Sequence, residues 1–412
     1  MDQKLPLGIQ DFEKLRKVGF AYVDKTAHVY RLAQHGVPVL LVRPHRFGKS
    51  LFVSTLKAYF EGRRDLFEGL EIERLVGNGS GAWQKRPVFL LDFSGADYTH
   101  EGSLSAKLET MFRRFEAEWN IRTSELVMGN RFRSAIEAAH HTSGQRVVAL
   151  ADDYDKPLTD TMDNTPLFAC NRSRLTGFLS ALKRADEHLA FVFVTGTTKL
   201  PWTSVSGGLN QLRDISWERD FADVCGITED ELLATFAPKI EARASRLDLS
   251  SGGCLKALRD SYDGYCFHPD GPMGPDGPLE SRKVYDPRSL LNALENRRLG
   301  SRHIESNIPA FLARRLRDAR LDAKRLTDGT IFASETRLSC YAPDDPDPIP
   351  LFFQTGCLTI RAADTLVGEY ALGVPNDEVK RGLLECLLSA RASGHAGPDK
   401  ADAHQPHRFL SK

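Results

Sequence analysis

Nearly continuous apolar runs of strand length alternate with amphipathic segments through the first half of the chain. The apolar runs fall at residues 37–42, 87–93, 147–151 and 189–194. Apolar residues recur with helical spacing over residues 51–60, 104–117, 132–140 and 174–185. Strands that lack polar alternation are buried on both faces, which is typical of parallel sheets between layers of helices. The pattern therefore predicts an α/β fold with a parallel sheet covered by helices on both faces.

Beyond residue 226 the pattern becomes mainly helical. Thr228 and Glu231 form a capping-box signature ahead of a helix predicted over residues 232–244. Proline and glycine dominate residues 269–278, so we expect an irregular loop there, without strand or helix. The chain is thus predicted to have four parts: a core domain at residues 1–225, a helical lid or winged-helix-like domain at 226–330, a small α/β segment at 331–390 and a disordered tail at 391–412.

The segment between the first apolar run and the following helix, residues 43–50, has the character of a phosphate-binding loop. Gly48, Lys49 and Ser50 fit the end of such a loop. Its backbone amides surround a phosphate, its lysine reaches the phosphate oxygens and its hydroxyl binds magnesium. Arg43 stands where these loops usually have their first glycine. Taken alone, the tripeptide could equally cap an ordinary helix.

The apolar run at residues 147–151 ends in two acids, Asp152 and Asp153. A carboxylate at the end of a strand can hold the magnesium shell, and the next acid can polarise an attacking water. A solvated acidic turn is the alternative. Because a phosphate loop and an acid-ended strand occur in the required order, we expect ATP and Mg²⁺ as ligands. Ser50 and Asp152 are then the metal ligands, and Asp153 is the catalytic acid.

The apolar run at residues 189–194 ends in a short polar stretch that begins with Thr195. In P-loop ATPases, a polar residue at the end of the strand between the loop strand and the acid strand senses the γ-phosphate. Thr195 or Thr198 is the candidate for this role, and we assign it to Thr195. A strand followed by an ordinary glycine turn is an almost equally good interpretation.

Several short motifs together resemble the predicted AAA-ATPase-like family of bacterial proteins. They fall at residues 5–12, 22–26, 43–50, 154–157, 195–199, 208–210, 214–216, 284–287, 351–356 and 374–379. The family's loop reads R-P-x-R-F-G-K-S, which accounts for the arginine in place of the first glycine. The resemblance covers roughly residues 1–390 and implies a P-loop NTPase core. The implied nucleotide-binding residues are Arg43, Arg46, Phe47, Gly48, Lys49, Ser50 and Leu51.

The chain also departs from the family pattern. Asp153 stands where the family has glutamate, and a carboxylate displaced by about 1 Å can lower a rate roughly 100-fold. Members of the family often carry a C-terminal PD-(D/E)XK nuclease-like domain, and no acid followed by an E-x-K strand occurs after residue 390. We therefore expect that domain to be missing. Two functions stay open: a slow Mg²⁺-dependent ATPase coupled to a protein partner, and a non-hydrolysing, nucleotide-dependent interaction module.

Composition narrows the class of partner. The chain has 55 basic and 55 acidic residues and a formal net charge of zero, so no overall field attracts nucleic acid. Nucleic-acid contact and self-association stay open. Its seven cysteines show no C-x-x-C spacing, which favours free thiols in a reducing compartment. The chain has no apolar leader and no apolar run long enough to span a bilayer, so we expect a soluble, cytoplasmic protein.

Overall fold

The computed structural model describes most of the chain. The described residues are 3–77, 83–121, 127–199, 212–269, 273–274, 277–278, 283–296, 312, 326, 331–341, 347–364 and 367–393. The motif at residues 208–210 and the tail beyond 393 lie outside them.

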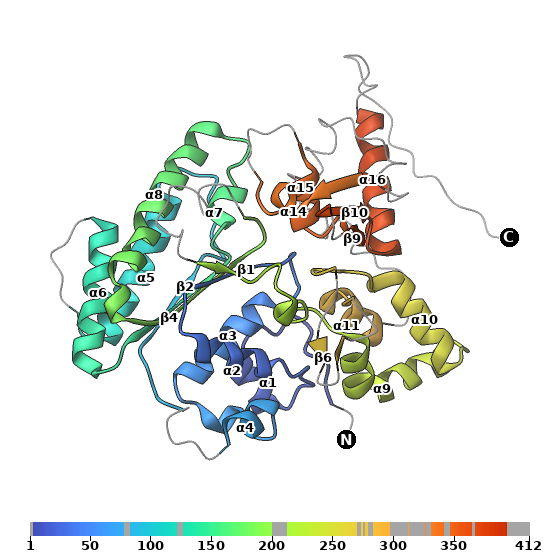
Figure 1. Ribbon diagram of the computed structural model, residues 1–412, viewed down its shortest axis with the longest axis horizontal. Coiled ribbons are helices and arrows are strands. Elements are labelled where there is room, and N and C mark those ends of the chain that lie inside the picture. Colours follow the sequence, from blue (N-terminus) through green and yellow to red (C-terminus); the bar gives the residue numbers. More distant parts are fainter. Residues whose placement is uncertain are drawn as a thin grey trace, which may run out of the picture.

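A five-stranded parallel sheet forms the centre of the molecule (Figure 1). Its strands are β1 (Val39–Val42), β2 (Val88–Asp92), β3 (Val147–Asp152), β4 (Leu189–Gly196) and β5 (Arg213–Asp214). The strand order is β2-β3-β4-β1-β5. β4 therefore lies between the strand that leads into the predicted phosphate loop and the strand that ends in the two acids, as the sequence predicts.

Helices cover both faces of the sheet, which confirms the predicted α/β fold. One layer contains α1 (Phe12–Val18), α2 (Thr26–His35), α3 (Lys49–Phe60) and α4 (Glu71–Val76). The other contains α5 (Ser103–Glu118), α6 (Met128–Ser143) and α8 (Thr165–Arg184). Alternate strand residues belong to two separate hydrophobic clusters, one beneath each layer. This is the period-two division of a strand that is buried on both sides.

Short elements complete the core. They are the 3₁₀ turns η1 (Arg64–Leu66), η2 (Asp186–His188) and η4 (Arg219–Phe221), and the single-turn helix α7 (Lys156–Thr159) that directly follows the acids of β3. Asn164 caps α8 by accepting a hydrogen bond from the Leu167 amide at 3.2 Å. None of the described helices is both long and apolar enough to cross a membrane. The seven cysteines form no disulfide.

A helical unit follows the core, built from α9 (Glu229–Arg246), α10 (Ser251–Tyr262) and α11 (Pro287–Glu295). The predicted capping box is confirmed, because the Glu231 amide donates to the Thr228 hydroxyl and the Thr228 amide donates to the Glu231 carboxylate. The prediction of no strand in residues 269–278 is wrong. Two-residue strands β6 (Met273–Gly274) and β7 (Gly277–Pro278) pair there as an antiparallel hairpin.

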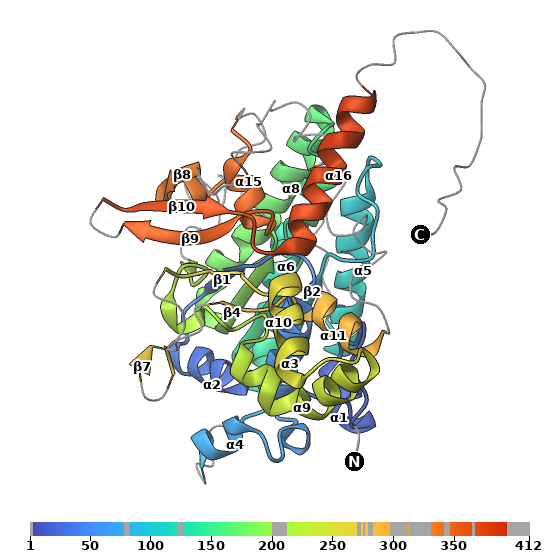
Figure 2. The ribbon, with the colours of Figure 1, turned by 90° about the vertical axis from the view of Figure 1, so that its right-hand side faces the viewer.

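The C-terminal part forms a three-stranded antiparallel sheet with helices beside it (Figure 2). Its elements are β8 (Ile331–Ser334), α14 (Glu335–Leu338), α15 (Ile349–Gln354), β9 (Thr359–Asp364), β10 (Glu369–Gly373) and α16 (Asp377–Ser393). Helix α16 ends at Ser393, within the tail that the sequence predicts to begin at residue 391. Buried residues of this part, including Ile360 and Leu372, share a hydrophobic cluster with Val42 of β1. The C-terminal part also packs against the predicted loop, because a β-carbon at Gly356 would lie 2.9 Å from the Pro44 side chain.

Candidate nucleotide site

The loop between β1 and α3 has the backbone shape that its sequence predicts. Gly48 caps α3 in the left-handed region, with φ of 95°, and Arg46 also has a positive φ of 69°. The first intrahelical bond of α3 runs from the Phe52 amide to the Gly48 carbonyl. The amides of Lys49, Ser50 and Leu51 precede that bond, so they have no carbonyl partner within the helix. A helix N-terminus with such amides is suited to binding an anion.

Lys49 lies inside the loop. Its side chain is only 4% exposed. The ammonium group donates to the carbonyls of Arg43 and Pro44, both at 3.0 Å, and lies 3.3 Å from the Thr197 hydroxyl. The lysine thus bridges the start of the loop and the residues that follow β4. A phosphate in the loop would compete with these carbonyls for the ammonium group.

Arg43 is held by the protein backbone. Its guanidinium group donates to the carbonyls of Val42, Ser216 and Phe221 at 2.8, 3.0 and 2.9 Å. It also lies over the ring of Phe267, 4.2 Å from the centroid. These contacts tie the end of β1 to the segment after β5. Arg43 stands at the position of the usual first glycine, and in this structure it stabilises the loop through these contacts. Its assignment as a nucleotide ligand stays a prediction.

The other predicted loop residues lie at the boundary with the later parts of the chain. Phe47 is buried, and its ring packs edge-on against Tyr265 at a centroid distance of 4.7 Å. Arg46 is half-buried, and burial together with the charge of Arg288 lowers its pKa. Leu51 is half-buried on the first turn of α3. The geometry brings Gly48, Lys49 and Ser50 together as predicted, and turns Phe47 toward the helical unit.

The predicted metal ligands also come together. Asp152, at the end of β3, is 6% exposed, and the Ser50 side chain hydrogen-bonds to it. Its Oδ1 atom is buried without a hydrogen-bond partner. Burial, followed by the charge of Asp153, raises the pKa of Asp152 to about 7. A buried carboxylate with one oxygen bonded to a hydroxyl and the other without a partner fits a divalent cation, which would neutralise the negative charge.

The described residues hold no group of three or more His, Cys, Asp or Glu side chains arranged for a metal ion. Mg²⁺ characteristically keeps several waters and takes only one or two carboxylates in nucleotide sites, with phosphate oxygens completing the shell. Ser50 and Asp152 therefore fit Mg²⁺ in the presence of a nucleotide, and fit a permanently bound structural metal poorly.

Asp153, the predicted catalytic acid, has a positive φ of 51° and is half-buried. The chain turns sharply here, and the Tyr154 amide donates to the Thr195 carbonyl at 3.1 Å. Asp155 then accepts the Thr197 amide, the Thr198 amide and the Thr198 hydroxyl, the last two at 2.7 Å. Asp155 is 2% exposed, so these bonds are shielded from water. These hydrogen bonds therefore hold the loop after β3, residues 153–155, against the loop after β4, residues 197–199.

Three threonines at the end of β4 have separate roles in the structure: Thr195 lies in the strand, and Thr197 and Thr198 follow it. The Thr195 hydroxyl donates to the Leu41 carbonyl at 2.8 Å, and the Thr198 hydroxyl donates to Asp155. Thr197 is the one whose hydroxyl reaches Lys49, and it also lies 3.4 Å from His45 Nδ1. Sequence reasoning missed Thr197, because strand alternation cannot be extended into the turn. The role of Thr195 as γ-phosphate sensor stays a prediction.

A small, mostly apolar pocket of about 90 Å³ lies beside the loop. Gly48, Leu51 and Thr55 form one wall. The other walls come from distant parts of the chain: Tyr22 and Val23, Val224 and Ile227, and Phe236 and Leu291. Lys25 also lines this pocket, where its ammonium group pairs with Glu231 at 2.6 Å. The N-terminal segment, α3 and the helical unit thus enclose a space at the base of the loop.

Asp152→Asn tests the raised pKa of the buried Asp152 carboxyl group. The folded-state pKa of about 7 lies above the ordinary value of 3.8, so the folded wild type binds this proton more tightly than the unfolded chain. Its stability therefore falls as the pH rises through this range. We expect the metal-free variant to gain stability relative to wild type between about pH 4 and 7, with no further gain above that.

Denaturant unfolding across this pH range measures the difference. Asp97→Asn, a substitution at an exposed acid, serves as the control and should show no such rise. A difference between Asp152→Asn and wild type that does not change with pH would contradict a raised pKa.

The strand order, the loop shape and the acid at the end of β3 define a P-loop NTPase-type α/β protein. The family model of the predicted AAA-ATPases (AAA-ATPase_like) matches residues 6–206. The chain is 32% identical over 390 residues to a protein of Azotobacter chroococcum mcd 1 described as "Uncharacterized protein in vnfD 5'region", over 94% of this chain and 70% of that protein. The chain belongs to the predicted AAA-ATPase family. No solved structure matches it significantly.

Proposed function

We propose that the protein binds ATP with Mg²⁺, hydrolyses it slowly and uses the nucleotide-dependent state to act on a protein partner. The observation that carries the proposal is the Oδ1 atom of Asp152, buried without a partner beside Ser50 at the start of α3. Leaving such an atom unpaired costs roughly 1–3 kcal/mol or more, which a ligand can recover. Membership of the predicted AAA-ATPase family supports nucleotide as that ligand.

Each side chain at the start of α3 and at the ends of β3 and β4 would have a separate role in binding the nucleotide. The first amides of α3 and the Lys49 ammonium group would hold the phosphates, since both are hydrogen-bond donors that belong to the same loop and helix N-terminus. Ser50 and Asp152 would hold Mg²⁺, which when bound neutralises phosphate charge. Thr197 lies next to Lys49, where it can donate to a terminal phosphate oxygen. The buried Asp155 keeps the loop after β4 in place.

The apolar pocket beside Gly48 supports a nucleoside triphosphate over a simple phosphate. It adjoins the N-terminus of α3, and its walls come from three parts of the chain, so a bound base would hold those parts together. Closure of the helical unit on the core would then depend on nucleotide. Such a two-state arrangement would give the protein a nucleotide-dependent surface for a protein partner.

Leu51→Trp tests the pocket by filling it from the first turn of α3. Burying a base there is worth roughly 2–3 kcal/mol of apolar contact, so ATP affinity should fall about 10- to 100-fold. Tripolyphosphate has no base, and its affinity should hold to within a few-fold. Calorimetric titration of both ligands into wild type and variant, with and without Mg²⁺, measures the contrast.

Leu233→Trp is the matched control, because Leu233 is exposed on the helical unit. An equal loss of ATP and tripolyphosphate affinity in Leu51→Trp would show that the substitution disturbs the loop and leaves the base pocket unsupported. Absence of any ATP binding by wild type would contradict the proposed function itself.

A non-hydrolysing, nucleotide-dependent interaction module is the second candidate. One observation favours it: Asp153 is both shorter than the family's glutamate and turned by a positive φ. A module of this kind would bind ATP with the same affinity pattern and show no turnover. Phosphate release by the wild type under saturating ATP and Mg²⁺ separates the two candidates.

A further inference from the structure

A cavity lined by several polar side chains lies on the side of the loop where Ser50 and Asp152 meet. Its volume is about 270 Å³, and it is lined by Ser50, Ser54 and Lys57 of α3, by Asp11, and by Asp92 and Asp152 at the ends of two strands. The cavity extends from the proposed metal ligands toward the end of β2. Nothing in the sequence pattern draws attention to Asp92, since it ends one strand among several.

The sheet brings Asp92 and Asp152 to one face. β2 and β3 are parallel neighbours, and Asp92 is in register with Asp152. Val88 and Leu90 precede Asp92 at alternate positions on the α3 side, as Val148 and Leu150 precede Asp152. Residues at alternate positions share a face. Both carboxylates therefore extend the α3 face of the sheet, where Ser50 begins its helix.

Asp153 does not continue this row. It follows Ala151 in the alternation, and Ala151 belongs to the hydrophobic cluster on the opposite face. The positive φ of Asp153 turns the chain again. Among the described residues, those that line the cavity include Asp92 and Asp152 but not Asp153. The acid that the sequence predicts as catalytic is thus outside the cavity that contains the proposed metal ligands.

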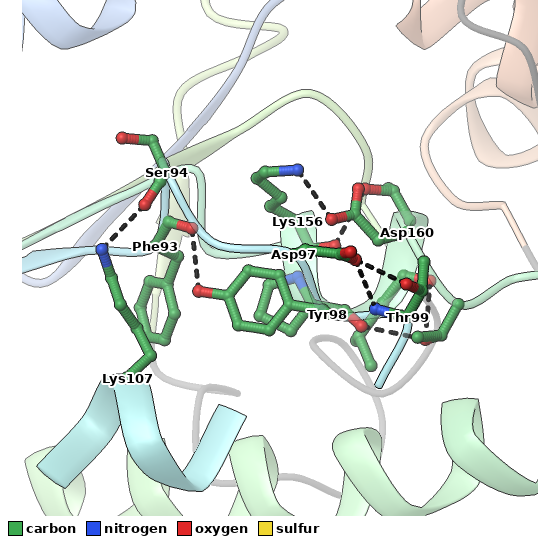
Figure 3. Close-up of polar contacts among 12 residues, drawn as sticks. Phe93, Ser94, Asp97, Tyr98, Thr99, Lys107, Lys156 and Asp160 are labelled. Atoms are coloured by element: carbon green, nitrogen blue, oxygen red, sulfur yellow. Dashed lines mark hydrogen bonds and ion pairs between the residues drawn. The ribbon is translucent and has the colours of Figure 1, made fainter. Parts of the chain in front are cut away.

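The segment after β2 holds Asp92 in a fixed position. Its Oδ1 atom accepts the Ser94 amide at 2.8 Å, which leaves Oδ2 for another partner. Figure 3 shows the loop that follows: the Tyr98 hydroxyl donates to the Phe93 carbonyl, and the Lys107 ammonium group donates to the Ser94 carbonyl. The latter two bonds measure 2.8 and 2.7 Å. A carboxylate fixed by its own loop is suited to positioning water.

We propose that Asp92 is the acid that accepts the proton of the attacking water, and this rests on the proposed ATPase function. In that step the water oxygen forms a bond to the γ-phosphorus. The bond from the γ-phosphorus to the bridging oxygen breaks, and its electron pair leaves on ADP. The water proton passes to Asp92, which later returns it to solvent. Asp152, whose Oδ1 is unpartnered and nine-tenths buried, serves the metal in the same cavity.

Asp92→Asn tests the proposal, because asparagine keeps the oxygen that accepts the Ser94 amide and removes only the charge. Asp97→Asn is the matched control: Asp97 accepts the Thr99 amide at 2.9 Å in the same kind of turn, but on the exposed surface (Figure 3). Two measurements are made on the full chain. They are the calorimetric affinities for ATP and ADP without metal, and the phosphate-release rate with Mg²⁺.

The affinities for ATP and ADP without metal show whether Asp92 lies near the γ-phosphate, and they do not depend on turnover. A carboxylate near the γ-phosphate repels ATP more than ADP, so Asp92→Asn should bind ATP about three- to tenfold more tightly and ADP nearly unchanged. Turnover should fall about 10²- to 10⁴-fold, the usual contribution of a positioned base. Asp97→Asn should match wild type in both measurements.

The results distinguish a failure of the proposed ATPase function from a failure of the role of Asp92. Wild type that binds neither nucleotide overturns the proposed function and this assignment with it. Nucleotide binding by wild type without turnover favours the non-hydrolysing module and overturns both the proposed hydrolysis and the role of Asp92. Wild-type turnover in Asp92→Asn overturns the role of Asp92 alone. Equal changes in ATP and ADP affinity would place Asp92 away from the γ-phosphate and also overturn it.

Discussion

Lys49→Ala is expected to weaken ATP binding about 10- to 100-fold. A charge-assisted hydrogen bond is worth roughly 1.5–3 kcal/mol, and the lysine can make one or more to the phosphates. The buried ammonium group also joins the Arg43 and Pro44 carbonyls, so its loss additionally loosens the loop that presents the amides. Calorimetric titration of ATP into wild type and variant measures the loss.

Lys17→Ala provides the control for Lys49→Ala. Lys17 is exposed on α1, where it pairs with Glu13 at 2.6 Å, and its removal should leave ATP affinity unchanged. An unaltered affinity in Lys49→Ala would refute the phosphate-loop assignment. Thermal unfolding of both variants shows whether a loss of affinity reflects a loss of fold, because an intact Lys49→Ala fold with weak ATP binding is the predicted combination.

Gly196→Ala is the second substitution from which we expect a large effect. A β-carbon at Gly196 would lie well inside contact distance of Asp155 Oδ1 and 2.8 Å from the ring of Tyr154. Asp155 could not move aside without giving up its bonds to Thr197 and Thr198. Overpacking combined with the loss of buried, charge-assisted bonds should cost about 3 kcal/mol or more of unfolding free energy.

Gly177→Ala is the matched control for Gly196→Ala. Gly177 lies within α8, and a β-carbon there would meet no atom within 4 Å. Alanine favours a helix over glycine by roughly 0.5–1 kcal/mol, so this variant should be as stable as wild type or slightly more stable. Denaturant unfolding of both variants gives the comparison. Equal stabilities of Gly196→Ala and wild type would show that the two loops are not locked together as described.

The predicted phosphate loop contacts both the helical unit and the C-terminal part of the chain. A β-carbon at Gly356 would lie 2.9 Å from the Pro44 side chain, so the C-terminal part packs directly on the loop. The Gly226 amide donates to the Phe47 carbonyl at 3.1 Å, and Phe47 packs on Tyr265. A change in the shape of the loop on nucleotide binding would therefore shift both the helical unit and the C-terminal part.

Local patterns predict the elements of the core well. The apolar runs became β1 to β4 with ends shifted by a residue or two, and the capping box at Thr228 begins α9 as predicted. The loop at residues 43–50 has a left-handed Gly48 at the start of a helix. These features depend on neighbours within a few residues along the chain, so the sequence contains the information that decides them.

The roles of single side chains depend on more distant neighbours. Arg43 belongs to a loop motif, yet its partners are carbonyls of Val42, Ser216 and Phe221 and the ring of Phe267. Thr195, Thr197 and Thr198 lie within four residues of one another at the end of β4, and only their packing shows that Thr197 reaches Lys49. Spacing within a motif gives the position of a residue but does not give its partner.

The sequence by itself determined that this protein has a parallel α/β core, a loop suited to phosphate and an acid at the end of another strand. The tertiary structure alone decided which acids face the same cavity. Asp92 and Asp152 meet because β2 lies beside β3 in register, and Asp153 is excluded because the chain turns there. The pairing of β2 with β3 depends on packing between segments far apart in the chain, so the residues around Asp92 do not by themselves show that it lies beside Asp152.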